Sequence, residues 1–286
     1  MDRKQLKEQS NTLIRTADPK PVVTAIIYIL ILAVLSFLSY EIAGDSAIKL
    51  QKVFEEFGFN YDVTINDFTY DYNYDLNNID PDQFFYAVQG AMPKPAAFLL
   101  GLAIQIVTIL LGAGFAIFCL RTVRGMEASY WNIFDAFGMF LRVLWLYILE
   151  GIFIFLWSLL FIFPGFIAFY RYRQALYLLL EHPEMSALQC ITESKRIMKG
   201  HKGELFVMDL SFIGWGILVG LVSYLGYSLA EAMAPSVIAD ILNTVGLGIL
   251  VQFYVMPYMD LTYAGYYVEL TKPAAAGFAD GWMPEL

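Results

Sequence analysis

Long apolar segments constrain this chain more than any other feature of its sequence. Four or more of them reach the roughly 18 to 20 residues that a helix needs to cross a hydrocarbon core about 30 Å thick. Of the 286 residues, 16% are charged, whereas soluble globular proteins carry roughly 25%. Because almost no sequence remains for a separate soluble domain, we expect a single integral membrane domain over residues 1–286.

The apolar runs predict an all-α polytopic membrane bundle of about six transmembrane helices, with amphipathic helices at the membrane interface. Pro164 and Gly165 are expected to end the third span and to turn the chain on the outer side. The fourth span is the shortest. The six spans are expected at residues 22–40, 96–118, 141–163, 166–181, 204–229 and 238–269.

The distribution of charge predicts the orientation of these spans. Lys and Arg in short loops stay on the cytoplasmic side, and five of them precede the first span: Arg3, Lys4, Lys7, Arg15 and Lys20. Residues 41–95 are acidic and are expected outside the membrane, as an extracytoplasmic loop. Both termini are therefore predicted to be cytoplasmic. With a net charge of −9, no nucleic-acid partner is expected.

Two segments carry the start signals of short amphipathic helices. Ser129 is a predicted N-cap for an interfacial helix over residues 130–137. Ser186 and Gln189 have the spacing of a capping box. The helix that follows them is expected to end at Gly200 and to place three apolar side chains on one face, namely Leu188, Ile191 and Met198.

A series of short motifs between residues 163 and 215 resembles a known family. The motifs are Phe163-Pro-Gly165, Arg171-Tyr-Arg173, His182-Pro-Glu-Met-Ser-Ala-Leu188, Glu193-Ser-Lys195, Met198-Lys-Gly200 and Asp209-Leu-Ser-Phe-Ile-Gly-Trp215. Together they resemble the bacterial integral membrane protein family known as domain of unknown function 975. The resemblance implies a multi-pass protein of the bacterial cytoplasmic membrane. It implies no reaction and no catalytic residue.

Charged residues inside the predicted spans form the first candidate site. An ionisable side chain within a span costs at least a few kcal/mol and usually faces a partner or a wet cavity. We therefore expect Glu150 to pair with Arg171 or Arg173 inside the bundle. Such a pair is either structural, or part of a ligand or proton pathway; alternatively, the fourth span is a cytoplasmic-side helix with exposed arginines. Asp209 and Asp260 are secondary polar candidates near span ends.

The sequence offers no strong metal site. Asp71, Asn73, Asp75, Asn77 and Asp82 follow the spacing of an EF-hand loop, but Leu76 replaces its glycine and the last ligand is Asp instead of Glu. Calcium is therefore not expected at the outer loop. His182 and His201 lack the companions of a zinc site. We expect no cofactor, and the absence of phosphate-loop and nucleophile-elbow motifs predicts a protein that is not an enzyme.

Two classes of function remain open. The first is a non-enzymatic membrane component that binds lipid or a protein partner through its interfacial helices and acidic outer loop. The second is a small-molecule or ion transporter with a polar site formed by spans three and four. The first is favoured, because broken helices, which often mark transport sites, are not evident in the sequence beyond Pro164 and Pro257.

Overall fold

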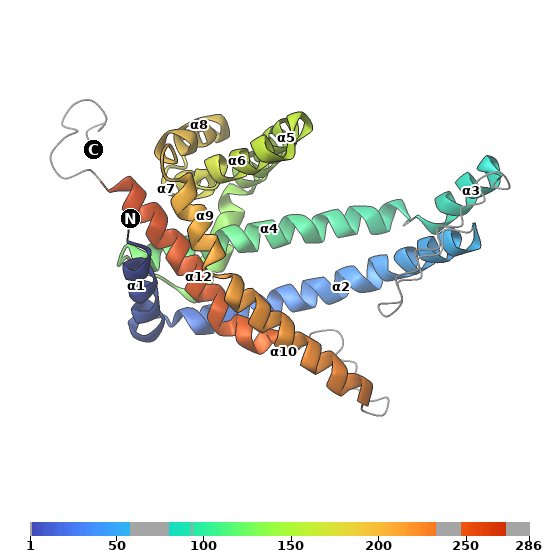
Figure 1. The fold of residues 1–286 in the computed structure, drawn as a ribbon, viewed down its shortest axis with the longest axis horizontal. Helices are drawn as coiled ribbons and strands as arrows, with labels where there is room; N and C mark the ends of the chain where they lie inside the picture. Colours follow the sequence, from blue (N-terminus) through green and yellow to red (C-terminus); the bar gives the residue numbers. More distant parts are fainter. Residues whose placement is uncertain (1, 58–79, 93, 233–246, 273–286) are drawn as a thin grey trace. The chain divides into compact units, whose positions relative to one another are not determined.

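A computed structural model describes residues 2–57, 80–92, 94–232 and 247–272 of the chain (Figure 1). Every regular element in these residues is a helix, which confirms the all-α prediction. The chain divides into two compact units, residues 32–107 and residues 1–31 with 108–286. The units are taken one at a time below.

The smaller unit holds the second half of α2 (Pro21–Glu56), all of α3 (Pro81–Ala91) and the first half of α4 (Pro95–Val123). Asp80 caps α3 by accepting a hydrogen bond of 3.0 Å from the Asp82 backbone N–H. The Phe84 ring of α3 packs against Phe57, 5.2 Å between centroids. The predicted outer loop, residues 41–95, is therefore helical at both ends. Asp71, Asn73, Asp75 and Asn77 lie outside the described residues.

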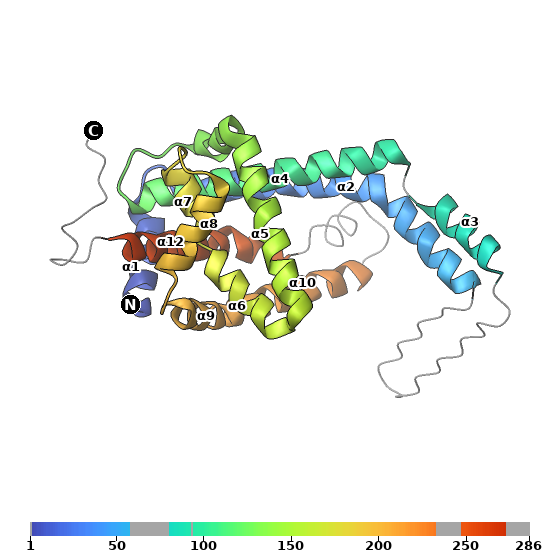
Figure 2. The same cartoon turned by 90° about the horizontal axis from the view of Figure 1, so that it is seen from above.

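The larger unit contains the remaining helices (Figure 2). After α1 (Arg3–Thr16) and the ends of α2 and α4 come η2 (Tyr130–Met139), α5 (Phe140–Leu160), α6 (Ile162–Tyr172), α7 (Ala175–Glu181), α8 (Ala187–Ile197), α9 (Lys202–Leu210), α10 (Ile213–Ala232) and α12 (Gly248–Thr271).

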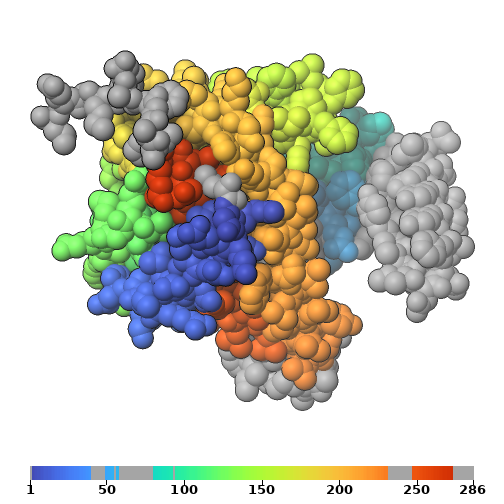
Figure 3. Space-filling view, turned by 60° about the vertical axis from the view of Figure 1, so that its left-hand side comes forward, coloured from blue at the N-terminus to red at the C-terminus, as the bar shows by residue number. Residues whose placement is uncertain are grey.

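Helix α12 organises the core of this unit. It packs against α10 and α1, and α1 (dark blue) lies along its surface in Figure 3. Thr262 Oγ1 donates to Ser10 Oγ on α1 at 3.1 Å. The buried side chains that join α1, α6, α9 and α12 are Leu6, Tyr170, Met198, Leu205, Met208, Phe212 and Tyr266.

Four helical segments are long and apolar enough to cross a membrane: Pro21–Ser39, Pro95–Val123, Tyr130–Leu160 and Lys202–Ala230. They correspond to the first, second, third and fifth predicted spans. The chain therefore has the make-up of an integral membrane protein. The sixth predicted span is described only as α12, which continues through Pro257; residues 238–246 of that span lie outside the described residues.

The fourth predicted span, residues 166–181, is wrong as a continuous helix. The chain forms α6 and α7 there, with a turn at Arg173 and Gln174. At 1.5 Å per residue, the eleven residues of α6 extend only about 16 Å, too little to cross a hydrocarbon core about 30 Å thick. Neither proline nor glycine lies at the break, so local sequence gives no sign of it.

Both predicted capping signals are confirmed. Ser129 and Ser186 each cap a helix, and in both cases the N3 side chain, Asn132 or Gln189, accepts a hydrogen bond from the cap residue's N–H. The helix after Ser129 is a 3₁₀ helix. The predicted apolar face of α8 needs one correction, because Ile191 and Met198 are buried but Leu188 is 53% exposed.

The turn between α5 and α6 depends on a close approach at Gly165. Phe161 links the two helices, so Pro164 and Gly165 lie in the first turn of α6 and not in the connection itself. A Cβ atom added to Gly165 would lie 2.0 Å from Ser158 Oγ on α5. Since no other residue leaves that space free, Gly165 sets how closely the two helices pack.

We therefore expect Gly165→Ala to destabilise the protein by about 1 to 3 kcal/mol, because the added methyl group overpacks the hairpin. Gly151→Ala is the matched control on α5, where an added Cβ meets nothing within 4 Å; it should be neutral or stabilising. Thermal unfolding of both variants in detergent measures the difference. Equal unfolding temperatures for the two would contradict the role assigned to Gly165.

Candidate functional site

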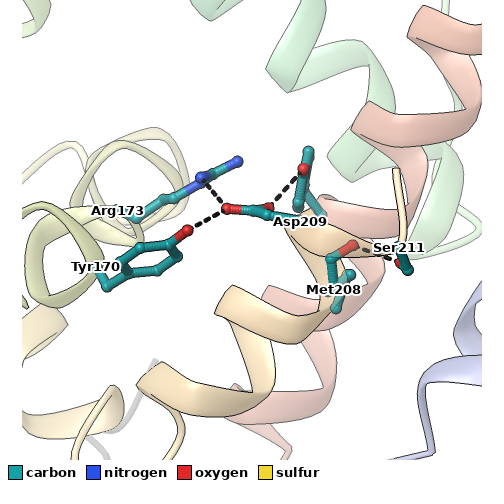
Figure 4. Close-up of polar contacts among 6 residues, drawn as sticks. Tyr170, Arg173, Met208, Asp209 and Ser211 are labelled. Carbon is teal, nitrogen blue, oxygen red and sulfur yellow. Dashed lines mark hydrogen bonds and ion pairs between the residues drawn. The ribbon is translucent and has the colours of Figure 1, made fainter. Parts of the chain in front are cut away.

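A carboxylate with three hydrogen-bond donors lies where α6, α9 and α12 meet (Figure 4). Asp209 Oδ2 accepts from the Tyr170 hydroxyl at 2.7 Å and from the Arg173 guanidinium at 2.9 Å. Asp209 Oδ1 accepts from the Tyr263 hydroxyl at 2.7 Å. We call these four residues the Asp209 cluster.

Helical spacing explains how two donors from one segment reach the same oxygen. Tyr170 lies in the last turn of α6 and Arg173 follows three residues later, so both side chains project to the same side. The Arg173 guanidinium carbon also lies 4.5 Å from the centroid of the Tyr263 ring, a cation–π contact that holds the guanidinium beside the carboxylate.

The cluster corrects the pairing predicted for Glu150. Arg173 pairs with Asp209, and Arg171 forms no side-chain hydrogen bond or ion pair with the described residues. Arg173 does not pair with Glu150 because the side chains of Tyr170 and Arg173, at the end of α6, face α9 and α12. Glu150 lies on α5. With its donors in place, Asp209 acts as a structural joint between three helices. A ligand site built from Glu150, Arg171 and Arg173 stays a prediction.

One buried hydroxyl joins the two sides of the break between α6 and α7. Ser194 Oγ, on α8, donates to the Arg171 carbonyl oxygen at 2.8 Å and accepts from the Gln174 backbone N–H at 3.2 Å. Ser194 has no exposed surface. Since a buried backbone group without a partner is costly, Ser194 is the side chain that makes the break possible.

Two buried acceptor oxygens, one of them on Gln174 in this break, lack donors among the described residues. Glu150 Oε1 and Gln174 Oε1 have no hydrogen-bond partner among the described residues, and Gln174 is only 1% exposed. Buried polar atoms are nearly always paired with protein groups, water or ions, so these two oxygens need an explanation. Asp260, on α12, also forms no hydrogen bond or ion pair with the described residues.

A wide basin of about 2010 Å³ opens beside α4, α7, α8 and α12. Two ion pairs lie on its wall: Arg121 with Asp135, at 3.5 Å, and Arg124 with Glu181. Its charged lining consists of Arg121, Arg124, Arg196, Lys199 and Lys272 with Asp135, Glu181 and Glu193, and its aliphatic lining includes Ile117, Leu120, Leu178, Leu180, Leu188, Ile197 and Leu270.

Sequence reasoning missed the basin and the Ser194 bridge. Arg121 and Arg124 entered the sequence argument only as charges that orient the chain, because their meeting with α7, α8 and α12 is a tertiary event. The one local signal was the mixture of basic and apolar residues around residues 188–199. No group of three or more metal-ligating side chains was found among the described residues.

Comparison with known proteins yields one match. The model of a family described as Protein of unknown function (DUF975) matches residues 161–274, the stretch that runs from the start of α6 to the end of α12. This stretch holds Ser194, Asp209 and the α6–α7 break, whereas Glu150 precedes it. No curated protein and no solved structure matches the chain.

We expect Asp209→Asn to destabilise the protein by about 1 to 3 kcal/mol, since it leaves a largely buried Arg173 guanidinium without its counter-charge. Glu193→Gln is the control, because its partner Arg196 has a side chain that is 72% exposed and such surface pairs contribute about 1 kcal/mol or less. Thermal unfolding in detergent compares the two. Equal effects of the two substitutions would refute the joint assigned to Asp209.

Proposed function

We propose that this chain, which belongs through residues 161–274 to the DUF975 family of proteins of unknown function, is a non-enzymatic component of a bacterial cytoplasmic membrane. In this proposal it binds an anionic lipid in the basin. The single observation that carries this proposal is the lining of the basin, which combines basic and aliphatic side chains. An anionic lipid presents the complementary pair of surfaces, a phosphate headgroup and acyl chains.

The charge of the basin favours an anion. Five basic side chains line it against three carboxylates. Lys199 forms no ion pair with the described residues, and the Arg121–Asp135 pair, at 3.5 Å, is long. These two cations are therefore the ones most available to a headgroup phosphate. Each Lys or Arg near a membrane surface contributes about 1 kcal/mol to the binding of anionic lipid.

The place of the basin in the chain fits the inner leaflet. Arg121 and Arg124 end α4, and basic residues in short loops stay on the cytoplasmic side. The basin then opens at the depth of the inner headgroups, with Leu178 and Leu270 of its wall available to the acyl chains.

A second function, transport of a small molecule or ion, is favoured by one specific observation. Discontinuous helices near polar groups are the usual framework of transport sites, and the predicted fourth span is discontinuous between α6 and α7. This break was not evident in the sequence. The transport alternative therefore rests on the break and its buried oxygens, whereas the lipid proposal rests on the basin.

The lipid proposal predicts selective retention of phosphatidylglycerol over phosphatidylcholine by the full chain in detergent, measured by native mass spectrometry. The variant Arg121→Gln with Lys199→Gln should weaken the binding of phosphatidylglycerol roughly tenfold or more, because two cations of about 1 kcal/mol each are lost.

The control variant, Lys4→Gln with Lys20→Gln, removes the same charge from exposed positions outside the basin. It should bind phosphatidylglycerol like the wild type. Equal retention of the two lipids by the wild type, or equal losses in the two variants, would show that the basin is not the lipid site.

A further inference from the structure

Two buried side-chain oxygens, on Gln174 in the break between α6 and α7 and on Glu150 of α5, have no hydrogen-bond donor among the described residues. Gln174 lies in the turn itself, and its backbone N–H is bound by Ser194 while its side-chain Oε1 has no partner among the described residues. Glu150 Oε1, on α5, is in the same condition. A site that presents oxygens without donors favours a cation over an anion or a hydrogen-bond acceptor.

Contacts of two α5 side chains with Tyr172 show which part of α5 runs beside the break. Trp157 Nε1 donates to the Tyr172 hydroxyl at 3.2 Å, and the Phe153 ring lies 6.2 Å from the Tyr172 ring. The two helices form an antiparallel hairpin, so residues before Phe153 on α5 meet residues after Tyr172. Glu150 lies one helical turn before Phe153, and Gln174 lies two residues after Tyr172.

Helix α8 gives an independent placement of the same two residues. Ser194 contacts the break, and Cys190 lies one turn earlier on the same buried face. Burial, together with the negative charges of Glu184 and Glu150, raises the pKa of the Cys190 thiol to about 11. The charge of Glu150 thus acts on Cys190, and the Gln174 backbone N–H bonds Ser194 one turn further along the same face of α8.

No cation among the described residues forms an ion pair with Glu150. Arg173 turns away to Asp209. Lys195 Nζ lies over the rings of Phe153 and Tyr172, at 5.6 and 5.4 Å from their centroids, and makes no ion pair with Glu150. An ionised carboxylate in a membrane interior is costly without a positive partner, so Glu150 either carries a proton or lies beside a bound cation.

We propose that Glu150 and Gln174 bind a small hard monovalent cation of the Na⁺ class at the break between α6 and α7. Carboxylate and amide oxygens are the ligands that hard cations prefer. A single carboxylate matches the charge of a monovalent ion, and water completes the coordination. The site is independent of the lipid basin, because the basin is lined by the opposite face of α8, at Gln189, Thr192 and Glu193.

The test uses the full chain in detergent at constant ionic strength, with NaCl replacing choline chloride. Trp157 is one of five tryptophans and lies beside the break, where its indole N–H bonds Tyr172; a Trp157→Phe variant identifies its share of the fluorescence signal. We expect a saturable change in tryptophan fluorescence and a saturable rise in unfolding temperature as Na⁺ increases. In Glu150→Gln the half-saturating Na⁺ concentration should rise roughly tenfold or more, which corresponds to about 1.4 kcal/mol.

Glu184→Gln is the matched control, because it removes the same charge from a residue that also lies near Cys190 but is exposed, outside the break. It should respond to Na⁺ like the wild type. Should Glu150→Gln fail to fold, Gln174→Leu replaces it: this variant keeps the carboxylate, removes the amide oxygen, and should raise the half-saturating concentration several-fold.

Three results would overturn the cation site. One is equal responses of the wild type to Na⁺ and choline. Another is a Na⁺ response that Glu150→Gln, or Gln174→Leu in its place, leaves unchanged. The third is a fluorescence change driven by pH alone with none driven by Na⁺ or Li⁺, since that result assigns the compensating charge to a proton on Glu150. Failure of the cation site leaves the lipid proposal untouched, because the lipid measurement uses different residues.

Discussion

The hydrogen bonds of one serine hold together the part of the molecule on which the candidate sites depend. In a membrane no water is available for exposed backbone groups, so a helix that stops inside the bundle needs partners from the protein. Ser194 supplies them on both sides of the α6–α7 break, to the Arg171 carbonyl and the Gln174 N–H. Helix α8 must therefore pack against the break. Its position then decides which of its side chains face the break and which face the basin.

Once α8 is held there, its two faces have different roles. The buried face carries Cys190 and Ser194 toward α5 and the break. The opposite face carries Glu193 and Arg196 into the basin. One short helix thus forms a wall of two separate polar environments, and motion of α8 would alter both.

The sequence predicted the features that are local and missed those that depend on helix rotation. Apolar length predicted four helices that can cross a membrane, and the caps at Ser129 and Ser186 follow from side chains three residues from their targets. The break at Gln174 has no local cause, because its partner lies twenty residues later on α8. The pairing of Arg173 with Asp209 could not be predicted either, because the length of an apolar segment does not tell which way each side chain of a helix faces.

The contrast between two carboxylates separates structural from functional polar groups in this protein. Asp209 accepts three hydrogen bonds and faces a guanidinium, so its charge and its lone pairs are used by the fold. Glu150 has a buried oxygen that the described residues leave unpaired. A fold gains nothing by keeping such an oxygen buried, because an apolar side chain of similar size would avoid the cost of desolvation. The unpaired carboxylate is therefore better explained by something that binds to it than by the stability of the helices around it.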